Sequence, residues 1–254
     1  MLDWTLIGPG LVAGLLVLLT HVPLGRIVLQ RGIIFIDLAI AQIAGLGVIA
    51  AHSLGWEVNG FKAQLVALTA AITGAFLLSR AEKFMERQQE ALIGISFVLA
   101  ATAGLLLLAH NPQGGEHLRD LLIGQILWTT WEDLIPLAII SVIFALLFWR
   151  FPQLLRRETF YIVFAIIITF SVQVVGVYLV FASLVIPAFA LFREMNKPLL
   201  KAYVLGVIGY LTGMLLSLYF DLPTGATVVW SLAFIAACYM VIVRISESFD
   251  RLNR

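Results

Sequence analysis

The chain alternates between long apolar stretches and short polar segments along its whole length. Most of the stretches approach the ~20 residues that a helix needs to cross a bilayer. They run approximately over Trp4–Thr20, Ile33–Leu54, Ala63–Leu78, Ala91–Ala109, Leu134–Trp149, Phe160–Val175, Val177–Phe192, Leu199–Phe220 and Ala226–Val243. This pattern predicts an all-α polytopic membrane protein in which residues 1–254 form a single transmembrane domain of eight or nine helices.

The longest uncharged run lies between Glu158 and Arg193. As one helix it would be about 50 Å long, whereas the hydrocarbon core of a bilayer is about 30 Å thick. We therefore expect residues 159–192 to break inside the membrane. The residues that favour a break are Ser171, Gln173, Gly176, Ser183 and Pro187. Broken backbone is tolerated only inside a protein bundle or beside a water-filled path, which indicates a protein that moves something across the membrane.

A second irregular region is expected near residues 118–128. Its apolar part, Leu121–Trp128, is too short to span and predicts a surface-lying or re-entrant helix. The loop before it contains four side chains whose nitrogen and oxygen donors suit zinc, manganese or iron. They are His110, Glu116, His117 and Asp120. They form a candidate metal contact, although their spacing matches no closed metal site.

Composition narrows the function. The chain is 61% hydrophobic and 12% charged, with a mean hydropathy of +1.02, which excludes an ordinary soluble domain. The net charge of +1 argues against a nucleic-acid partner. No room remains for a nucleotide-binding domain, and the sequence shows no nucleophile–base pairing, Gly-rich phosphate loop or HExxH motif. We therefore expect a protein that is not an enzyme.

The loops between the apolar stretches alternate in charge. If the long run counts as two crossings, all the basic loops fall on one side of the membrane. The positive-inside rule then gives nine crossings with the N-terminus outside and the C-terminus in the cytoplasm. We expect the protein to lie in the inner (plasma) membrane. If one half of the run is re-entrant, eight crossings remain and one terminus breaks the rule. The basic loops and tail contain Arg26 and Arg31, Arg80 to Arg87, Arg150 to Arg157, Arg193 to Lys201, and Arg244 to Arg254.

Polar residues inside the apolar stretches are candidates for lining a pathway. Asp37 is either an acid on a cation pathway or an interfacial acid paired with Arg26 or Arg31. Gln42 lies five residues further on, about 140° around a helix, so the two side chains do not share a narrow stripe. Three more candidates are Ser171, Gln173 and Ser183, and such residues serve either a pore or hydrogen bonds between helices.

Several segments, in order along nearly the whole chain, resemble the permease subunit of the zinc/manganese/iron class of ATP-binding-cassette importers. The most specific are Val175–Val180 and Leu184–Ala188, with the sequences VGVYLV and LVIPA. The others are His21–Gly25, Arg31–Ala39, Glu90–Ile95, Leu121–Leu127, Trp131–Leu134 and Asp221–Ala226.

This resemblance implies a homodimeric subunit that accepts a divalent cation from an extracytoplasmic binding protein and is driven by cytoplasmic ATPase subunits. The metal is then a substrate, and no permanently bound cofactor is expected. Asp37 matches the family's acid in the second helix. Glu90 matches its acid at a cytoplasmic helix end, and with Arg156, Arg157 and Arg193 it is a candidate for coupling to the ATPase.

The chain departs from the family's pattern in two places. The family commonly has a histidine four residues after the acid, where this chain has Ala41. The family also has about twenty more cytoplasmic residues where this chain has only the short loop from Arg150 to Glu158. These departures favour an alternative, a secondary carrier or channel that is derived from such a permease and works without an ATPase. The hydrophobic composition also fits a third class, a membrane-embedded assembly or scaffold protein.

Overall fold

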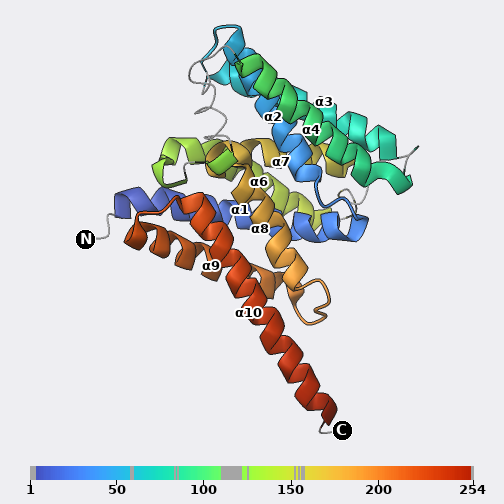
Figure 1. The fold of residues 1–254 in the computed structure, drawn as a ribbon, viewed down its shortest axis with the longest axis vertical. Coiled ribbons are helices and arrows are strands. Elements are labelled where there is room, and N and C mark those ends of the chain that lie inside the picture. Colours follow the sequence, from blue (N-terminus) through green and yellow to red (C-terminus); the bar gives the residue numbers. More distant parts are fainter. Residues whose placement is uncertain are drawn as a thin grey trace.

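The computed structural model describes residues 4–57, 60–82, 84, 86–109, 122–124, 126–151, 153, 155 and 158–252, and within them the fold is all-helical. Figure 1 shows the arrangement of the helices. The bounds are α1 Trp4–Arg31, α2 Ile36–Ser53, α3 Phe61–Glu82, α4 Gln89–Leu108, α6 Trp131–Arg150, α7 Thr159–Val175, α8 Val177–Ala190, α9 Pro198–Phe220 and α10 Thr224–Leu252, with short 3₁₀ helices η1 Glu86–Gln88 and η2 Ile126–Trp128.

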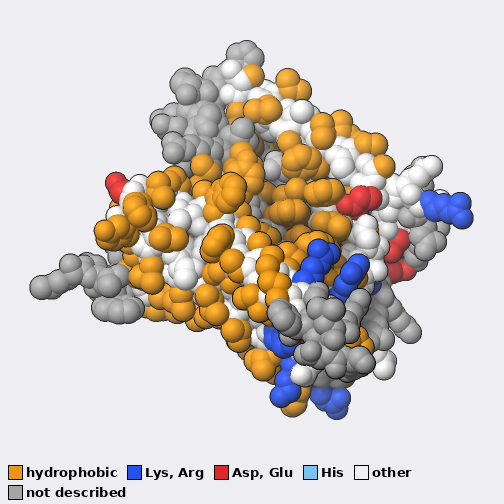
Figure 2. Space-filling view, turned by 60° about the horizontal axis from the view of Figure 1, so that its bottom comes forward, with side chains coloured by type: hydrophobic (Ala, Val, Ile, Leu, Met, Phe, Trp, Pro, Cys, Tyr) orange, Lys and Arg blue, Asp and Glu red, His pale blue; other side chains and the backbone are white. Residues whose placement is uncertain are grey.

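Seven of these helices are long and apolar enough to cross a membrane, and the bent pair of α7 and α8 adds an eighth span if it is counted as one. The expected all-α polytopic fold is confirmed. Helices α1 and α2 are the most enclosed, because 61% of the apolar window of each is buried, against 22% for α4, α6 and α10. Hydrophobic side chains cover most of the face in Figure 2, and Lys and Arg gather toward one side of it. Such an apolar surface suits contact with lipid.

The helices pack in three groups. Helices α2, α3 and α4 lie together at the top of Figure 1, and α9 and α10 pair at the bottom, with α1, α6, α7 and α8 between them. The contact between α1 and α8 is close, since a Cβ atom on Gly25 would lie 1.9 Å from the carbonyl oxygen of Leu184. Because Pro23 has no N–H, it leaves the Leu19 carbonyl without its helical donor, and the Tyr203 hydroxyl of α9 donates to that oxygen at 3.1 Å.

The long uncharged run breaks at Gly176, as the sequence analysis expected. The chain changes direction by 120° there, so α8 runs back toward the side from which α7 came. Gly176 has φ 81 and ψ 161, a conformation that is essentially reserved for glycine. Its neighbour across the break is the backbone of residues 123–124, which belongs to the irregular region predicted near 118–128. Pro187, which was also expected to favour a break, lies inside α8, which continues to Ala190.

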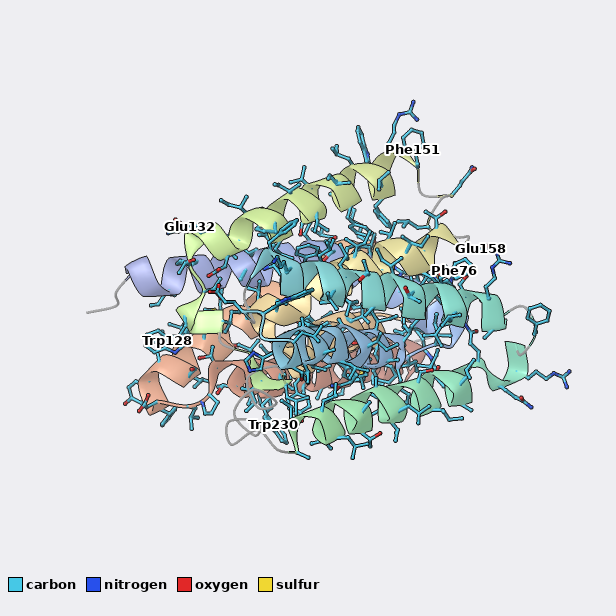
Figure 3. The ribbon with its side chains drawn as sticks, turned by 90° about the horizontal axis from the view of Figure 1, so that it is seen from above. Phe76, Trp128, Glu132, Phe151, Glu158 and Trp230 are labelled. Carbon is cyan, nitrogen blue, oxygen red and sulfur yellow. The ribbon has the colours of Figure 1, made fainter. Side chains whose placement is uncertain are left out.

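The reversal of chain direction between α7 and α8 also bears on which side of the bundle the basic loops lie. If each spanning helix takes the chain to the opposite side and α7 and α8 form a re-entrant pair, the ends of α1, α3, α6, α8 and α10 share one side of the bundle. Figure 3 shows the two ends of α6, with Glu132 and Trp128 at one end of the bundle and Phe151 and Glu158 at the other.

Candidate functional site

Asp37 is a buried acid whose carboxylate oxygens have no hydrogen-bond partner. Gly32, with φ 70, ends α1, and the chain turns so that α2 begins at Ile36 and Asp37 falls in its first helical turn. The side chain is 1% exposed, and both Oδ1 and Oδ2 are unpartnered. The positive end of the helix dipole favours an acid at this position. An isolated buried carboxylate is nevertheless costly, so we regard Asp37 as the centre of the candidate site.

Glu90 is the neighbour of Asp37 from another helix. It lies in the first turn of α4, and its Oε1 accepts a hydrogen bond from the Phe35 backbone N–H at 3.2 Å. Its second oxygen, Oε2, is buried and unpartnered. The two carboxyl groups also interact electrostatically with each other. The structure thus brings together a residue predicted to line the pathway and one predicted to couple to the ATPase.

Arg31 does not neutralise Asp37 through a hydrogen bond. Its guanidinium carbon lies 4.5 Å from the centre of the Phe160 ring, and Nη2 donates to the Leu155 carbonyl at 3.3 Å. Neither Asp37 oxygen has a hydrogen-bond partner, so Asp37 makes no hydrogen bond to Arg26 or Arg31. Arg31 instead connects the end of α1 to the start of α7 and to the short loop before it.

A buried hydrogen bond between two side chains connects α4 to α7 next to Glu90. Gln89, the residue before Glu90, donates from Nε2 to the Tyr161 hydroxyl of α7 at 2.5 Å. Tyr161 also packs edge-on against Phe160. The starts of α2, α4 and α7 and the end of α1 are therefore joined around the two acids.

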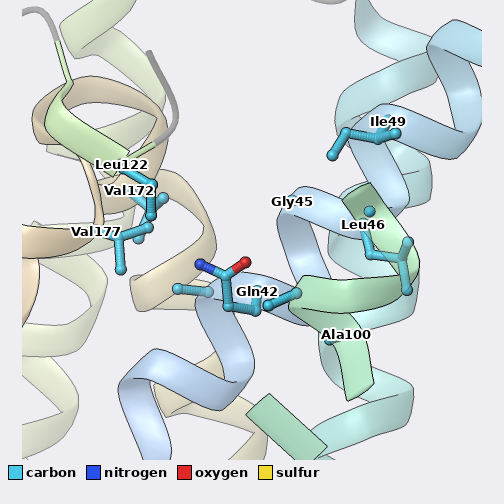
Figure 4. Close-up of a pocket in the computed structure, with 11 residues that line it drawn as sticks. Gln42, Gly45, Leu46, Ile49, Ala100, Leu122, Val172 and Val177 are labelled. Carbon is cyan, nitrogen blue, oxygen red and sulfur yellow. The ribbon is translucent and has the colours of Figure 1, made fainter. Parts of the chain in front are cut away.

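Gln42 lines a small pocket between α2, α4 and the α7–α8 break. Figure 4 shows its amide between Leu122, Val172 and Val177 on one side and the α4 segment with Ala100 on the other. The cavity volume is about 10 Å³, which is roughly enough for one water molecule. The pocket is therefore closed to a hydrated ion in this conformation.

The three remaining pathway candidates differ in their surroundings. Ser171 is fully buried in α7, and its Oγ has no hydrogen-bond partner. Gln173 lies two residues on and is exposed. Ser183 is buried in α8, where its Oγ donates to the Leu179 carbonyl at 2.7 Å and lies 2.8 Å from the Tyr210 hydroxyl. Ser183 thus joins α8 to α9, while Ser171 is the one of the three with unused hydrogen-bonding capacity inside the bundle.

Some candidates lie outside the described residues. These are the metal candidates His110, Glu116, His117 and Asp120 and the coupling candidates Arg156 and Arg157. Arg193 is exposed in the turn after α8. Within the part of the chain that the structure describes, no three His, Cys, Asp or Glu residues gather as a metal site would require.

The pairing of Asp37 with Glu90 was not predicted from the sequence. Both acids occur in the first turn of a helix that follows a basic loop, so both were expected near one side of the membrane. That shared position was the available signal. It does not indicate that α2 and α4 pack against each other, which is what makes the two acids neighbours.

The sequence matches the ABC 3 transport family over residues 3–157 and 151–243. The chain belongs to this family. It is a membrane permease, as the resemblance of its motifs predicted.

Relatives of this permease have been named for different metals. The manganese transport system membrane protein MntC of Halalkalibacterium halodurans is 24% identical, over 90% of this chain and 84% of the relative. The high-affinity zinc uptake system membrane protein ZnuB of Buchnera aphidicola is 23% identical, over 91% and 95%. The fold is similar to that of a solved structure, PsaBC from Streptococcus pneumoniae in complex with Fab, with a TM-score of 0.73, 18% identity, and coverage of 92% of this chain and 90% of that one.

Proposed function

We propose that this permease carries a divalent transition-metal cation, zinc, manganese or iron, into the cell as the membrane subunit of an ATP-driven importer. The observation that carries the proposal is the buried, unpartnered Asp37 carboxylate inside a transport-family bundle. Intramembrane acids mark cation pathways because their burial is otherwise costly. The names of the zinc and manganese relatives support a metal as the cargo.

The proposed importer has further components. A separate cytoplasmic ATPase would supply the energy, and an extracytoplasmic metal-binding protein would deliver the cation. A second copy of this chain would complete a homodimer. The family match supports the ATPase and the binding protein, and the exposed apolar helix faces support contact with lipid or another copy. The basic loops would face the cytoplasm, with the C-terminus on that side, in the plasma membrane. The metal would be cargo, with no permanently bound cofactor.

The test is the metal content of cells that lack the gene. We expect the deletion to lower the cellular content of one of the three metals, and the wild-type gene to restore it. Asp37→Asn should fail to restore it, while Glu132→Gln, which removes an exposed acid at the opposite end of the bundle, should succeed. Unchanged metal content in the deletion strain would contradict the proposal.

A second candidate function is a carrier that works without an ATPase. It is favoured by the short connection between Arg150, where α6 ends, and Thr159, where α7 begins. Purified permease in liposomes distinguishes the two functions. Uptake of a divalent ion by the lone subunit under a proton or sodium gradient would support the carrier, whereas uptake that stops when ATP hydrolysis is blocked in cells would support the importer.

A further inference from the structure

We propose that the bundle opens between two groups of helices, α2–α4 and α7–α8, and that the Tyr161 hydroxyl is the positioning group that holds this interface closed at the end that carries the basic loops. The inference rests on the proposed transport function and adds to it the interface that moves and the residue that controls the movement.

The small pocket beside Gln42 lies on this interface. Residues of α2 and α4 line one side of it, and Leu122, Val172 and Val177 line the other (Figure 4). Its volume of about 10 Å³ leaves room for about one water molecule. Because the two walls belong to different helix groups, the pocket widens when α2–α4 move away from the α7–α8 break.

The hydrogen bond between Gln89 and Tyr161 crosses the same interface. Gln89 begins α4, and its Nε2 donates to the Tyr161 hydroxyl of α7 at 2.5 Å. Both side chains are buried. Since the amide donates to the phenolic oxygen, the phenolic proton remains for an acceptor. Glu82, the last residue of α3, interacts with the same hydroxyl and supplies a carboxylate. One hydroxyl of α7 is therefore tied to the end of α3 and the start of α4.

The ring of Tyr161 is held from the other side. Phe160 packs edge-on against it with the ring centroids 5.6 Å apart. The guanidinium carbon of Arg31, the last residue of α1, lies 5.7 Å from the centre of the Tyr161 ring. The ring thus stays with α1 and α7 while the hydroxyl contacts α3 and α4. A movement of one helix group against the other must therefore break the contacts of the hydroxyl.

The size of the effect follows from how helices associate in membranes. Packing and hydrogen bonds between helices decide the arrangement there, because water does not press the helices together. Loss of one such hydrogen bond should raise the fraction of open molecules about three- to tenfold, which corresponds to ~0.6–1.4 kcal/mol.

The test is the rate at which N-ethylmaleimide modifies a cysteine placed in the pocket of the purified full-length permease in detergent. Val177 is 3% exposed and lines the pocket, so Val177→Cys reports on opening with little change in side-chain volume. It is combined with Cys238→Ser, which removes the native cysteine. Tyr161→Phe, which removes the hydroxyl and keeps the ring, should raise the rate about three- to tenfold. Gln89→Leu should also raise it, and adding Gln89→Leu to Tyr161→Phe should give no further increase, because the two side chains act through one bond.

Tyr203→Phe is the matched control. It removes a tyrosine hydroxyl whose hydrogen bond, to the Leu19 carbonyl at 3.1 Å, joins α9 to α1 and does not cross the proposed interface. It should leave the rate at position 177 unchanged. A second reporter in α9, Ala202→Cys, is placed at a residue that is 1% exposed and should stay protected in Tyr161→Phe, which separates local opening from general loosening.

Three results would overturn the proposal: an unchanged rate at position 177 in Tyr161→Phe, an equal rise in Tyr203→Phe, or a rise at positions 177 and 202 together. The measurement contains no metal and is therefore independent of the cargo. A deletion strain with unchanged metal content would refute the proposed transport function, whereas an unchanged rate of modification would refute the moving interface alone.

Discussion

Replacing Gly176 by alanine should destabilise the protein. The loss should be larger than for the same substitution at a glycine of positive φ that has no close neighbours. At φ 81 and ψ 161, an alanine occupies a region that is essentially limited to glycine, at a cost of about 1–3 kcal/mol. The added Cβ would also lie 2.4 Å from the Gly124 nitrogen and 2.5 Å from the Ile123 carbonyl carbon. Carbon atoms pack at about 3.5–4 Å, so two backbones must move apart by roughly 1 Å. Overpacking of this kind costs about 1–3 kcal/mol.

Alanine substitutions at two other glycines separate the cost of backbone strain from the cost of overpacking. Gly32 has φ 70 with open space around its Cβ position, so Gly32→Ala carries the backbone strain alone, about 1–2 kcal/mol. Gly94 lies in α4 with nothing within 4 Å of the added methyl, so Gly94→Ala should be neutral or stabilise the helix by up to ~1 kcal/mol. We expect Gly176→Ala to lose about 2–6 kcal/mol, the sum of the backbone strain and the overpacking.

The assay is reversible unfolding of the purified permease in mixtures of a mild detergent and sodium dodecyl sulfate, followed by circular dichroism. The order of stability should be Gly94→Ala, then Gly32→Ala, then Gly176→Ala. If Gly176→Ala were no less stable than Gly32→Ala, the close contact between the break and residues 123–124 would be refuted.

Three further predictions concern charged or ligand positions. Ala41→His should place an imidazole one turn from Asp37 and raise the affinity for Zn²⁺ relative to Mn²⁺ by about tenfold or more, measured by competition on the purified protein; an unchanged ratio would show that position 41 does not reach the acids. Asp37→Asn should abolish the rise in melting temperature that the transported divalent cation causes in the wild type; a retained rise would contradict a role of Asp37 in binding the cation. The Lys201 ammonium, 2.8 Å away, is the main cause that lowers the pKa of Glu194 from 4.5 to about 2. Since the folded pKa is below the unfolded one, this contact stabilises the protein above pH 4.5 and is lost as the pH falls toward 2; Glu194→Gln should therefore show a smaller loss of thermal stability over that window, and an equal loss would exclude this pair as a cause.

The break in the long uncharged run could be predicted because its basis is length, which a sequence shows directly. Which of the candidate residues forms the break could not be predicted from the sequence. Pro187 is a strong local signal against a helix, yet α8 continues three residues beyond it to Ala190. Gly176 breaks the helix because another backbone, at residues 123–124, occupies the place where its side chain would be. That contact joins segments about fifty residues apart in the chain, and no local pattern contains it.

The roles of polar residues inside the bundle also depend on contacts between distant segments, which the local sequence does not show. Ser171 and Ser183 have the same chemistry and similar apolar surroundings in the sequence, so both were predicted to line a pathway. In the structure Ser183 lies beside Tyr210 of the neighbouring helix, while the Oγ of Ser171 has no hydrogen-bond partner. The difference depends on which helix packs opposite each serine, since an intramembrane hydroxyl bonds across helices wherever a partner is in reach.

The proximity of Asp37 and Glu90 likewise depends on helix packing that the sequence does not show. The sequence predicts Asp37 on the pathway and Glu90 at the ATPase contact, because each pattern is local to its own segment. Packing of α2 against α4 places both acids at one corner, where Phe35 orients Glu90 and Arg31 connects the same corner to Leu155 of the short loop. The loop between α6 and α7 is therefore linked to the end of α1 through Arg31, and residues 32–35 connect Arg31 to the start of α2. A movement of that loop has a physical route to the acids, through Arg31 and the turn that leads into α2.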